Sequence, residues 1–140
     1  MLSKEKDPSF FLPRPIIKWL DSLDLAYSIR NPRRDLANGF IIAEILARRY
    51  PTEINIYTIY NGLQTDQKRD NWELISKLLS KKEFPLKKEE YEQIYNYVPD
   101  VAYRFLIKLY EFLNRRKLPG IVTKPTKNTT EPSKNATALG

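Results

Sequence analysis

The chain has 140 residues, of which 41% are hydrophobic, and this is enough for one domain with a sizeable core. It contains no cysteine and no histidine, which excludes disulfides, thiolate metal sites, cysteine nucleophiles and histidine bases. Its formal net charge of +7 favours an anionic partner, such as nucleic acid, an acidic membrane surface or an acidic protein polymer.

Residues 1–13 are predicted to be a leader that is either a free end or an arm packing through Phe10 and Phe11. The leader lacks the apolar stretch of a secretory signal, so a reducing, intracellular compartment is expected. The first helix is predicted over residues 15–24, because proline suits the first helical turn. Its apolar face comprises Ile16, Ile17, Trp19, Leu20 and Leu23.

A second helix is predicted over residues 35–50, where the first residue, an aspartate, would serve as the N-cap. Residues 40–47 are apolar almost throughout, so this helix is expected to be buried on all sides. Glu44 and Arg48 are four residues apart and are expected to pair on its exposed strip. Gly39 would cost about 1 kcal/mol relative to alanine inside a helix, and close helix–helix approach is the expected reason for it.

The remaining elements are also predicted to be helical. Residues 52–63 are expected to form a helical turn or an irregular segment, because no second strand is available for pairing. Helices follow over about residues 65–82, 89–97 and 100–117. Their predicted inward faces are Trp72, Ile75, Leu78 and Leu79; Tyr91, Ile94 and Tyr95; and, with strong 3–4 periodicity, Val101, Ala102, Phe105, Leu106, Leu109, Phe112 and Leu113. The predicted fold is therefore all-α, with four main helices plus short ones. A domain over residues 14–118 is followed by an extended or disordered tail over 119–140, rich in Thr, Lys, Pro, Asn and Ser.

No set of residues indicates catalysis. The sequence lacks phosphate-binding glycine loops and metal-ligand spacings, so we expect no enzyme activity, no cofactor and no metal. The neighbouring carboxylates, Asp21 with Asp24 and Glu89 with Glu90, are expected to be solvated or to cap helices. The tyrosines are scattered and are expected to pack with their hydroxyl groups at the surface, which argues against base stacking.

Three basic clusters are candidate binding groups. They comprise Arg30, Arg33 and Arg34; Lys81, Lys82, Lys87 and Lys88; and Arg115, Arg116 and Lys117. The first cluster lies at the N-terminal end of the predicted second helix, where positive charge opposes the helix dipole. A position that is unfavourable locally suggests a role in binding, and arginine binds carboxylates through two parallel hydrogen bonds.

The segment Arg34-Asp-Leu-Ala-Asn-Gly-Phe-Ile-Ile-Ala-Glu-Ile-Leu46 resembles the D-L-x-[DN]-G-x-x-[IL]-x-x-[IL] core of calponin-homology domains. Three further segments, 17–25, 30–35 and 68–72, are similar to the calponin-homology-like domain of the sperm-flagellar, CLAMP and spermatogenesis-associated family. The resemblance covers about residues 14–117. It implies a calponin-homology-like helical bundle without catalytic activity, located on the microtubules of the ciliary and flagellar axoneme.

The resemblance also implies partners: tubulin and other axonemal proteins, with no nucleic acid and no membrane, in the cytoplasm and cytoskeleton. We expect the loop Arg30–Arg34 to contact the acidic tails of tubulin and the other two clusters to make secondary contacts. The chain has no heptad run like the coiled coil of flagellar members, so a single domain that decorates or lines a microtubule is expected. Two alternatives stay open: an actin-binding or signalling adaptor use of the fold and, on charge alone, a nucleic-acid binder.

Overall fold

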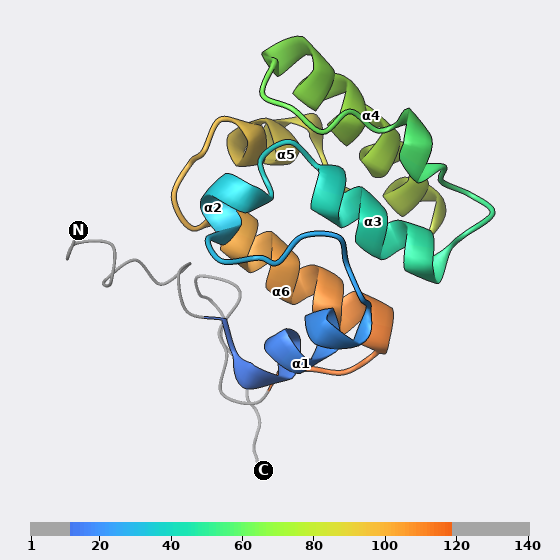
Figure 1. Cartoon of the computed structure of the whole chain (residues 1–140), viewed down its shortest axis with the longest axis vertical. Coiled ribbons are helices and arrows are strands. Elements are labelled where there is room, and N and C mark those ends of the chain that lie inside the picture. Colours follow the sequence, from blue (N-terminus) through green and yellow to red (C-terminus); the bar gives the residue numbers. More distant parts are fainter. Residues whose placement is uncertain (1–11, 119–140) are drawn as a thin grey trace.

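The computed structural model describes residues 12–118, which form six α-helices and one 3₁₀ turn and contain no strand (Figure 1). The predicted all-α fold is confirmed. In chain order the elements are α1 (Arg14–Ser22), α2 (Pro32–Asp35), α3 (Phe40–Arg49), η3 (Ile56–Thr58), α4 (Thr65–Lys81), α5 (Lys88–Tyr95) and α6 (Val101–Asn114). The predicted leader and tail fall mainly on residues 1–11 and 119–140, outside the described residues.

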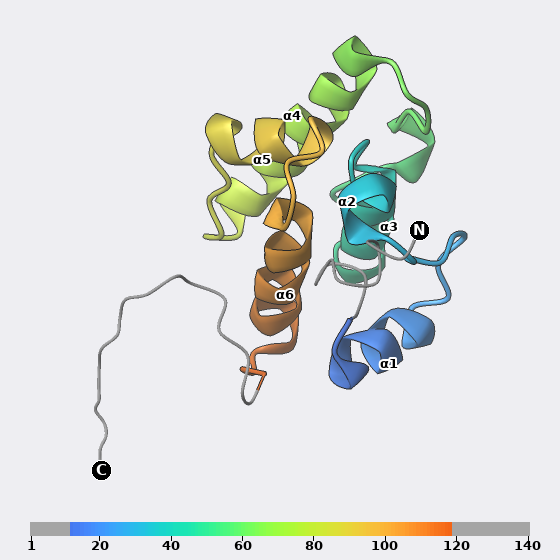
Figure 2. The ribbon, with the colours of Figure 1, turned by 90° about the vertical axis from the view of Figure 1, so that its left-hand side faces the viewer.

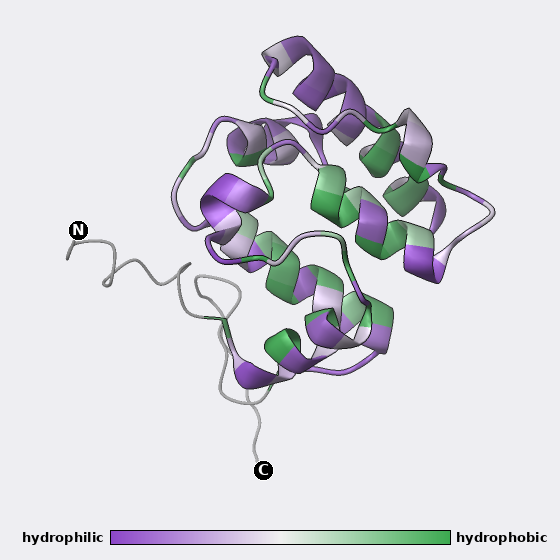
Figure 3. Cartoon of the chain, in the orientation of Figure 1, coloured by the Kyte–Doolittle hydropathy of each residue, from purple (hydrophilic) through white to green (hydrophobic). Residues whose placement is uncertain are grey.

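The centre of the domain is built from α3 and α6. All six residues from 41 to 46 are buried, as expected for a helix that is apolar on every side. The α6 helix buries residues on more than one face, and Figure 3 shows both helices as largely hydrophobic. Each fully buried isoleucine or leucine side chain contributes about 1.5–3 kcal/mol to the stability of the fold. The prediction of a buried second helix is therefore confirmed for its C-terminal part.

Trp72 of α4 connects the central helices to α5. The indole is fully buried, stacks on Tyr91 at 6.3 Å between ring centroids and meets Phe105 edge-on at 5.6 Å. Its Nε1 donates a hydrogen bond of 2.8 Å to the carbonyl of Ala37, so the polar atom of the ring has a partner. The core face predicted for this helix is confirmed: Trp72, Ile75, Leu78 and Leu79 are all buried.

The first helix closes one end of the bundle. Ile16 is wholly buried, and the half-buried Trp19 meets Tyr110 of α6 edge-on at 5.3 Å between ring centroids. The helix ends at Ser22, two residues earlier than predicted. Asp24 then adopts a left-handed backbone conformation with φ of 54°, which turns the chain away from the helix axis.

The helix predicted over residues 35–50 begins only at residue 40, because α2 ends at Asp35 and residues 36–39 form a turn between α2 and α3. Gly39 adopts φ of +83°, a left-handed conformation that separates α2 from α3. The side chain of Asn38 accepts a hydrogen bond from the backbone N–H of Phe40 at 2.9 Å, at the start of α3. A Cβ on Gly39 would lie 3.0 Å from the Ile75 side chain and 3.2 Å from that of Trp72. The expected close approach to another helix is therefore present, although the glycine lies outside the helix.

The predicted surface pair of Glu44 and Arg48 is wrong. Glu44 is only 7% exposed, and its two carboxylate oxygens accept from the backbone N–H of Ala26 at 3.0 and 3.3 Å. Arg48 donates instead to the carbonyls of Leu23 and Asp24, at 2.8 and 2.9 Å. The loop between α1 and α2 covers this strip of α3, so both side chains form hydrogen bonds with the backbone of that loop.

Candidate protein-interaction surface

The arginines of the first cluster lie on α2 and just before it. Arg33 and Arg34 occupy the last turn of α2, and α3 begins only at residue 40. The expected conflict with the dipole of the buried helix is therefore absent, and this part of the prediction is wrong. Basic residues in the last turn stabilise a helix through its dipole, so the position of these arginines does not by itself indicate binding.

A single carboxylate organises the arginine loop. Asp35 Oδ2 accepts from the backbone N–H groups of Arg30 and Asn31, each at 2.9 Å. Its Oδ1 accepts a hydrogen bond of 3.0 Å from Arg34 Nε, and the two side chains form an ion pair. Burial alone would raise the pKa of Asp35, but the two backbone hydrogen bonds and the Arg34 guanidinium outweigh it and lower that pKa below 3.8. The Asp35 carboxylate thus binds the backbone of the loop that precedes it, and it is not the predicted N-cap of a long helix.

Arg33 is held from the other side of the loop. Its Nε donates 3.0 Å to the carbonyl of Tyr97, which links α2 to the connection between α5 and α6. Tyr97 has a left-handed backbone (φ of 63°), and its hydroxyl is 3.2 Å from Lys68 Nζ. Lys68 is 4% exposed, also donates 3.3 Å to the carbonyl of Tyr95 and places its ammonium 4.6 Å from the Tyr97 ring centroid.

A second buried polar residue of α4 fixes the loop before α3. Asn71 Nδ2 donates to the carbonyls of Asn38 and Tyr60 at 2.9 and 2.6 Å, and its Oδ1 accepts from the Tyr60 N–H at 3.1 Å. Reasoning from the sequence missed both Lys68 and Asn71. Their signal is positional, because residues 68, 71, 72 and 75 share one face of a helix that is otherwise apolar there.

Exposed apolar side chains lie beside Arg34. Tyr27 is 53% exposed and Leu63 is 79% exposed, and together with Tyr97 and Arg34 they line a groove of about 320 Å³. The Arg34 side chain itself is 65% exposed. Tyrosine and arginine are enriched in protein–protein contacts, where they are frequent hot spots. The arginine face is defined here as Tyr27, Arg30, Arg33, Arg34, Leu63 and Tyr97.

Much of the lysine cluster is neutralised within the domain. Lys81 and Lys82 both pair with Glu53, at 3.6 and 2.5 Å, and Lys88 lies 3.9 Å from Glu92. The hydrogen bond from Lys82 is the main reason that the pKa of Glu53 is lowered. Lys87 lies at the start of α5, where its backbone N–H donates 2.9 Å to Glu90, one of the carboxylates expected to be solvated or capping.

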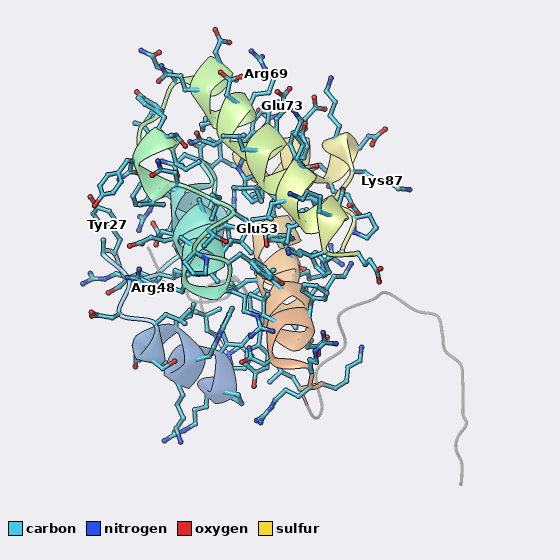
Figure 4. All side chains as sticks on the ribbon, turned by 90° about the vertical axis from the view of Figure 1, so that its right-hand side faces the viewer. Tyr27, Arg48, Glu53, Arg69, Glu73 and Lys87 are labelled. Carbon is cyan, nitrogen blue, oxygen red and sulfur yellow. The ribbon has the colours of Figure 1, made fainter. Side chains whose placement is uncertain are left out.

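The third cluster is less neutralised. Lys117 lies 3.8 Å from Glu111, whereas Arg115 and Arg116 are exposed and form no ion pair with another residue of the range 12–118. Figure 2 shows α2 on one side of α6 and the α4–α5 connection on the other. Figure 4 shows Tyr27 and Lys87 projecting at opposite edges of the molecule. The three basic clusters therefore do not form one patch, and the arginine face stands apart.

Other features of the described part bear on function. Within residues 12–118 there is no group of three or more acidic side chains able to hold a metal ion. None of the helices in this range is both long enough and apolar enough to cross a bilayer. The expected packing of the tyrosines holds for Tyr91, Tyr95 and Tyr110, which are buried, but not for Tyr57, which projects from η3 almost fully exposed.

Comparison with known proteins decides the family. The sequence model described as "CH-like domain in sperm protein" matches residues 16–111, from α1 to the last turns of α6. The chain belongs to this family. It is 31% identical over 102 residues to sperm flagellar protein 1 of Bos taurus, covering 71% of this chain and 42% of the relative. The protein of the same name from Mus musculus is 32% identical over 102 residues, covering 71% of this chain and 43% of the relative.

The chain spans about two fifths of the length of these relatives, so the similarity concerns the CH-like domain. The predicted family is thereby confirmed. Within the domain, the residues that carry the resemblance have structural roles: Leu36 and Ile42 are fully buried, and Gly39 adopts the left-handed turn against α4. Arg30 and Arg34 of the 30–35 segment are exposed to solvent.

Proposed function

We propose that this CH-like domain is a non-catalytic microtubule-binding component of the ciliary or flagellar axoneme. Its relatives are sperm flagellar proteins, which supports a cytoskeletal role in flagella. The observation that carries the proposal is the arginine face, in which exposed guanidinium groups adjoin exposed tyrosine and leucine side chains on a rigid support. Tubulin, with other axonemal proteins as neighbours, is the proposed partner.

The geometry suits an acidic protein surface. Arginine forks pair with carboxylates through two hydrogen bonds, and the tails of tubulin are acidic. Asp35 and Tyr97 already hold the loop and Arg33 in place, so binding would order fewer side chains. The lysine and C-terminal clusters, expected to be secondary contacts, lie on the other side of α6. A partner that covers the arginine face would leave them accessible.

The test is co-sedimentation with microtubules at low and physiological salt, using Arg30→Glu combined with Arg34→Glu. We expect the double variant to bind at least about tenfold more weakly, which corresponds to ~1.4 kcal/mol. Arg33 is left unchanged because its bond to Tyr97 supports the fold. The matched control reverses two exposed lysines elsewhere, Lys18→Glu with Lys77→Glu, and makes the same change in net charge.

Equal affinity of the charge-reversed variant and the wild type would refute the arginine face as the binding surface. Equal losses in the variant and in the control would show that net charge alone attracts the polymer. Actin filaments are pelleted in parallel, because binding to actin but not to microtubules would favour the alternative use of the same fold. A steep salt-dependent affinity for DNA with sequence preference would favour a nucleic-acid binder.

A further inference from the structure

A second surface runs along α6. Residues 104, 108 and 112 are spaced by four positions each, so they form one stripe on the helix, and residue 115 is the C-cap that follows it. The connection between α4 and α5 lies beside this stripe through Phe84, whose ring is 4.8 Å from that of Phe112. Two adjoining hollows of about 450 and 550 Å³ share Phe84 and Lys108 as lining residues. The α6 groove is defined as Phe84, Arg104, Lys108, Phe112, Arg115 and Arg116.

The α6 groove combines an apolar floor with four cations, of which Arg104 pairs with Asp100 at 3.7 Å and the other three have no ion pair within residues 12–118. Phe84 and Phe112 are half-buried and pack on the core from the outer side of α6. Lys108, Arg115 and Arg116 are exposed, and none of them pairs with a carboxylate of residues 12–118. The carboxylates beside the groove are already engaged: Glu90 accepts from the Lys87 N–H, and Glu111 from the Leu118 N–H while pairing with Lys117.

The position of this groove separates it from the arginine face. It is formed by the side of α6 that faces the α4–α5 connection, whereas α2 packs against the other side of α6 (Figure 2). One partner can therefore occupy the arginine face while a second occupies the α6 groove. The stripe and its C-cap, from residue 104 to residue 115, are about 16 Å long at 1.5 Å per residue. This length matches roughly three turns of a partner helix.

We propose that the α6 groove binds an acidic amphipathic helix of a second protein. The apolar face of that helix would cover Phe84 and Phe112, and its flanking carboxylates would meet Lys108, Arg115 and Arg116. A helix lying in a groove with anchors at i, i+4 and i+7 is a common mode of recognition. Charge complementarity selects an acidic segment, and the phenylalanines select an amphipathic one. This inference is independent of the proposed partner of the arginine face.

The test uses fluorescence anisotropy with the full chain and three labelled synthetic peptides. The first is an 18-residue helix (a length of about five turns) with leucines on one face and glutamates beside them. The second has the same composition in scrambled order, and the third is oligo-glutamate of the same charge. We expect the amphipathic peptide to bind at least about tenfold more tightly than the other two at physiological salt.

The variant for this test is Lys108→Glu combined with Arg115→Gly. Lys108 has no ion pair to lose within residues 12–118, and Arg115 has φ of 52°, a conformation that glycine adopts without strain. The substitutions should therefore leave the fold intact and weaken binding of the amphipathic peptide at least about tenfold. The control is again Lys18→Glu with Lys77→Glu, which should bind the peptide within about twofold of wild type.

Three results would overturn the proposal. The first is equal binding of the scrambled or oligo-glutamate peptide, which would reduce the groove to general electrostatic attraction. The second is unchanged peptide affinity in the Lys108→Glu, Arg115→Gly variant. The third is a loss of microtubule binding in this variant as large as that in Arg30→Glu, Arg34→Glu, because the two surfaces would then share one partner. The proposed function fails separately, if the arginine variant keeps its microtubule affinity.

Discussion

Replacing Asn71 by alanine should destabilise the domain far more than a change of this size at the surface. Asn71 is 3% exposed and makes three hydrogen bonds, two as donor to the carbonyls of Asn38 and Tyr60 and one as acceptor from the Tyr60 N–H. Each typically contributes about 1 kcal/mol, and each backbone group left unpaired in a buried position costs about 1–3 kcal/mol. We expect Asn71→Ala to lower the free energy of unfolding by about 3 kcal/mol.

The assay is urea unfolding followed by circular dichroism, with the denaturant slope fitted for each variant. In a parallel thermal unfolding experiment, a change of roughly 4–5 °C per kcal/mol is expected for a domain of this size, so Tm should fall by about 12–15 °C. Asn96→Ala is the matched control, since Asn96 is exposed at the end of α5 and should change stability by no more than about 0.5 kcal/mol.

A second variant separates shape from hydrogen bonding. Asn71→Asp has nearly the same shape and retains an acceptor for the Tyr60 N–H, but it loses both donors and turns carboxylate oxygens toward two carbonyls. It should therefore destabilise the domain at least as much as alanine does. A cost below about 1 kcal/mol for Asn71→Ala, at an unchanged denaturant slope, would refute the reasoning that these bonds hold the loop.

Two further substitutions test the segment between α2 and α3. Gly39→Ala should lower stability by about 2–4 kcal/mol in thermal unfolding, from a left-handed backbone and a contact at 3.0 Å with Ile75; a cost under about 1 kcal/mol would contradict this. Asp35→Asn should remove a pH-dependent contribution. The Asp35 pKa is lowered when folded, so its stabilisation is present above the ordinary value of 3.8 and lost as the pH falls through the folded pKa. The stability difference between wild type and variant should shrink on acidification across that range, and a difference that stays constant would speak against it.

Hydrophobic periodicity predicted most of the fold correctly, because burial of apolar faces decides where these helices lie. The core face of α4 and the inward residues of α5 and α6 could be assigned from spacing alone. The start of α3 could not. An aspartate ahead of an apolar run is a frequent N-cap pattern, but here the Asp35 carboxylate binds the backbone of residues 30 and 31.

The failures at Glu44 and Lys68 share a physical cause. Each side chain is satisfied by a backbone group distant in sequence, the Ala26 N–H for Glu44 and the Tyr95 carbonyl for Lys68. A helical wheel contains no information on which loop will cover a given strip. The candidate site was predictable as three basic segments, whereas their separation by α6 depends on tertiary packing that spacing cannot express.

The placement of the two tryptophans provides the domain with two independent optical reporters. Trp72 lies in the dry centre against Tyr91 and Phe105, while the half-buried Trp19 reports only whether α1 is docked on Tyr110. In a Trp19→Phe variant the remaining fluorescence comes from Trp72 and reports unfolding of the core. In a Trp72→Phe variant it comes from Trp19 and reports the detachment of α1. Agreement between the two unfolding curves would establish that α1 and the bundle unfold as one cooperative unit, and divergence would identify α1 as a separately opening part.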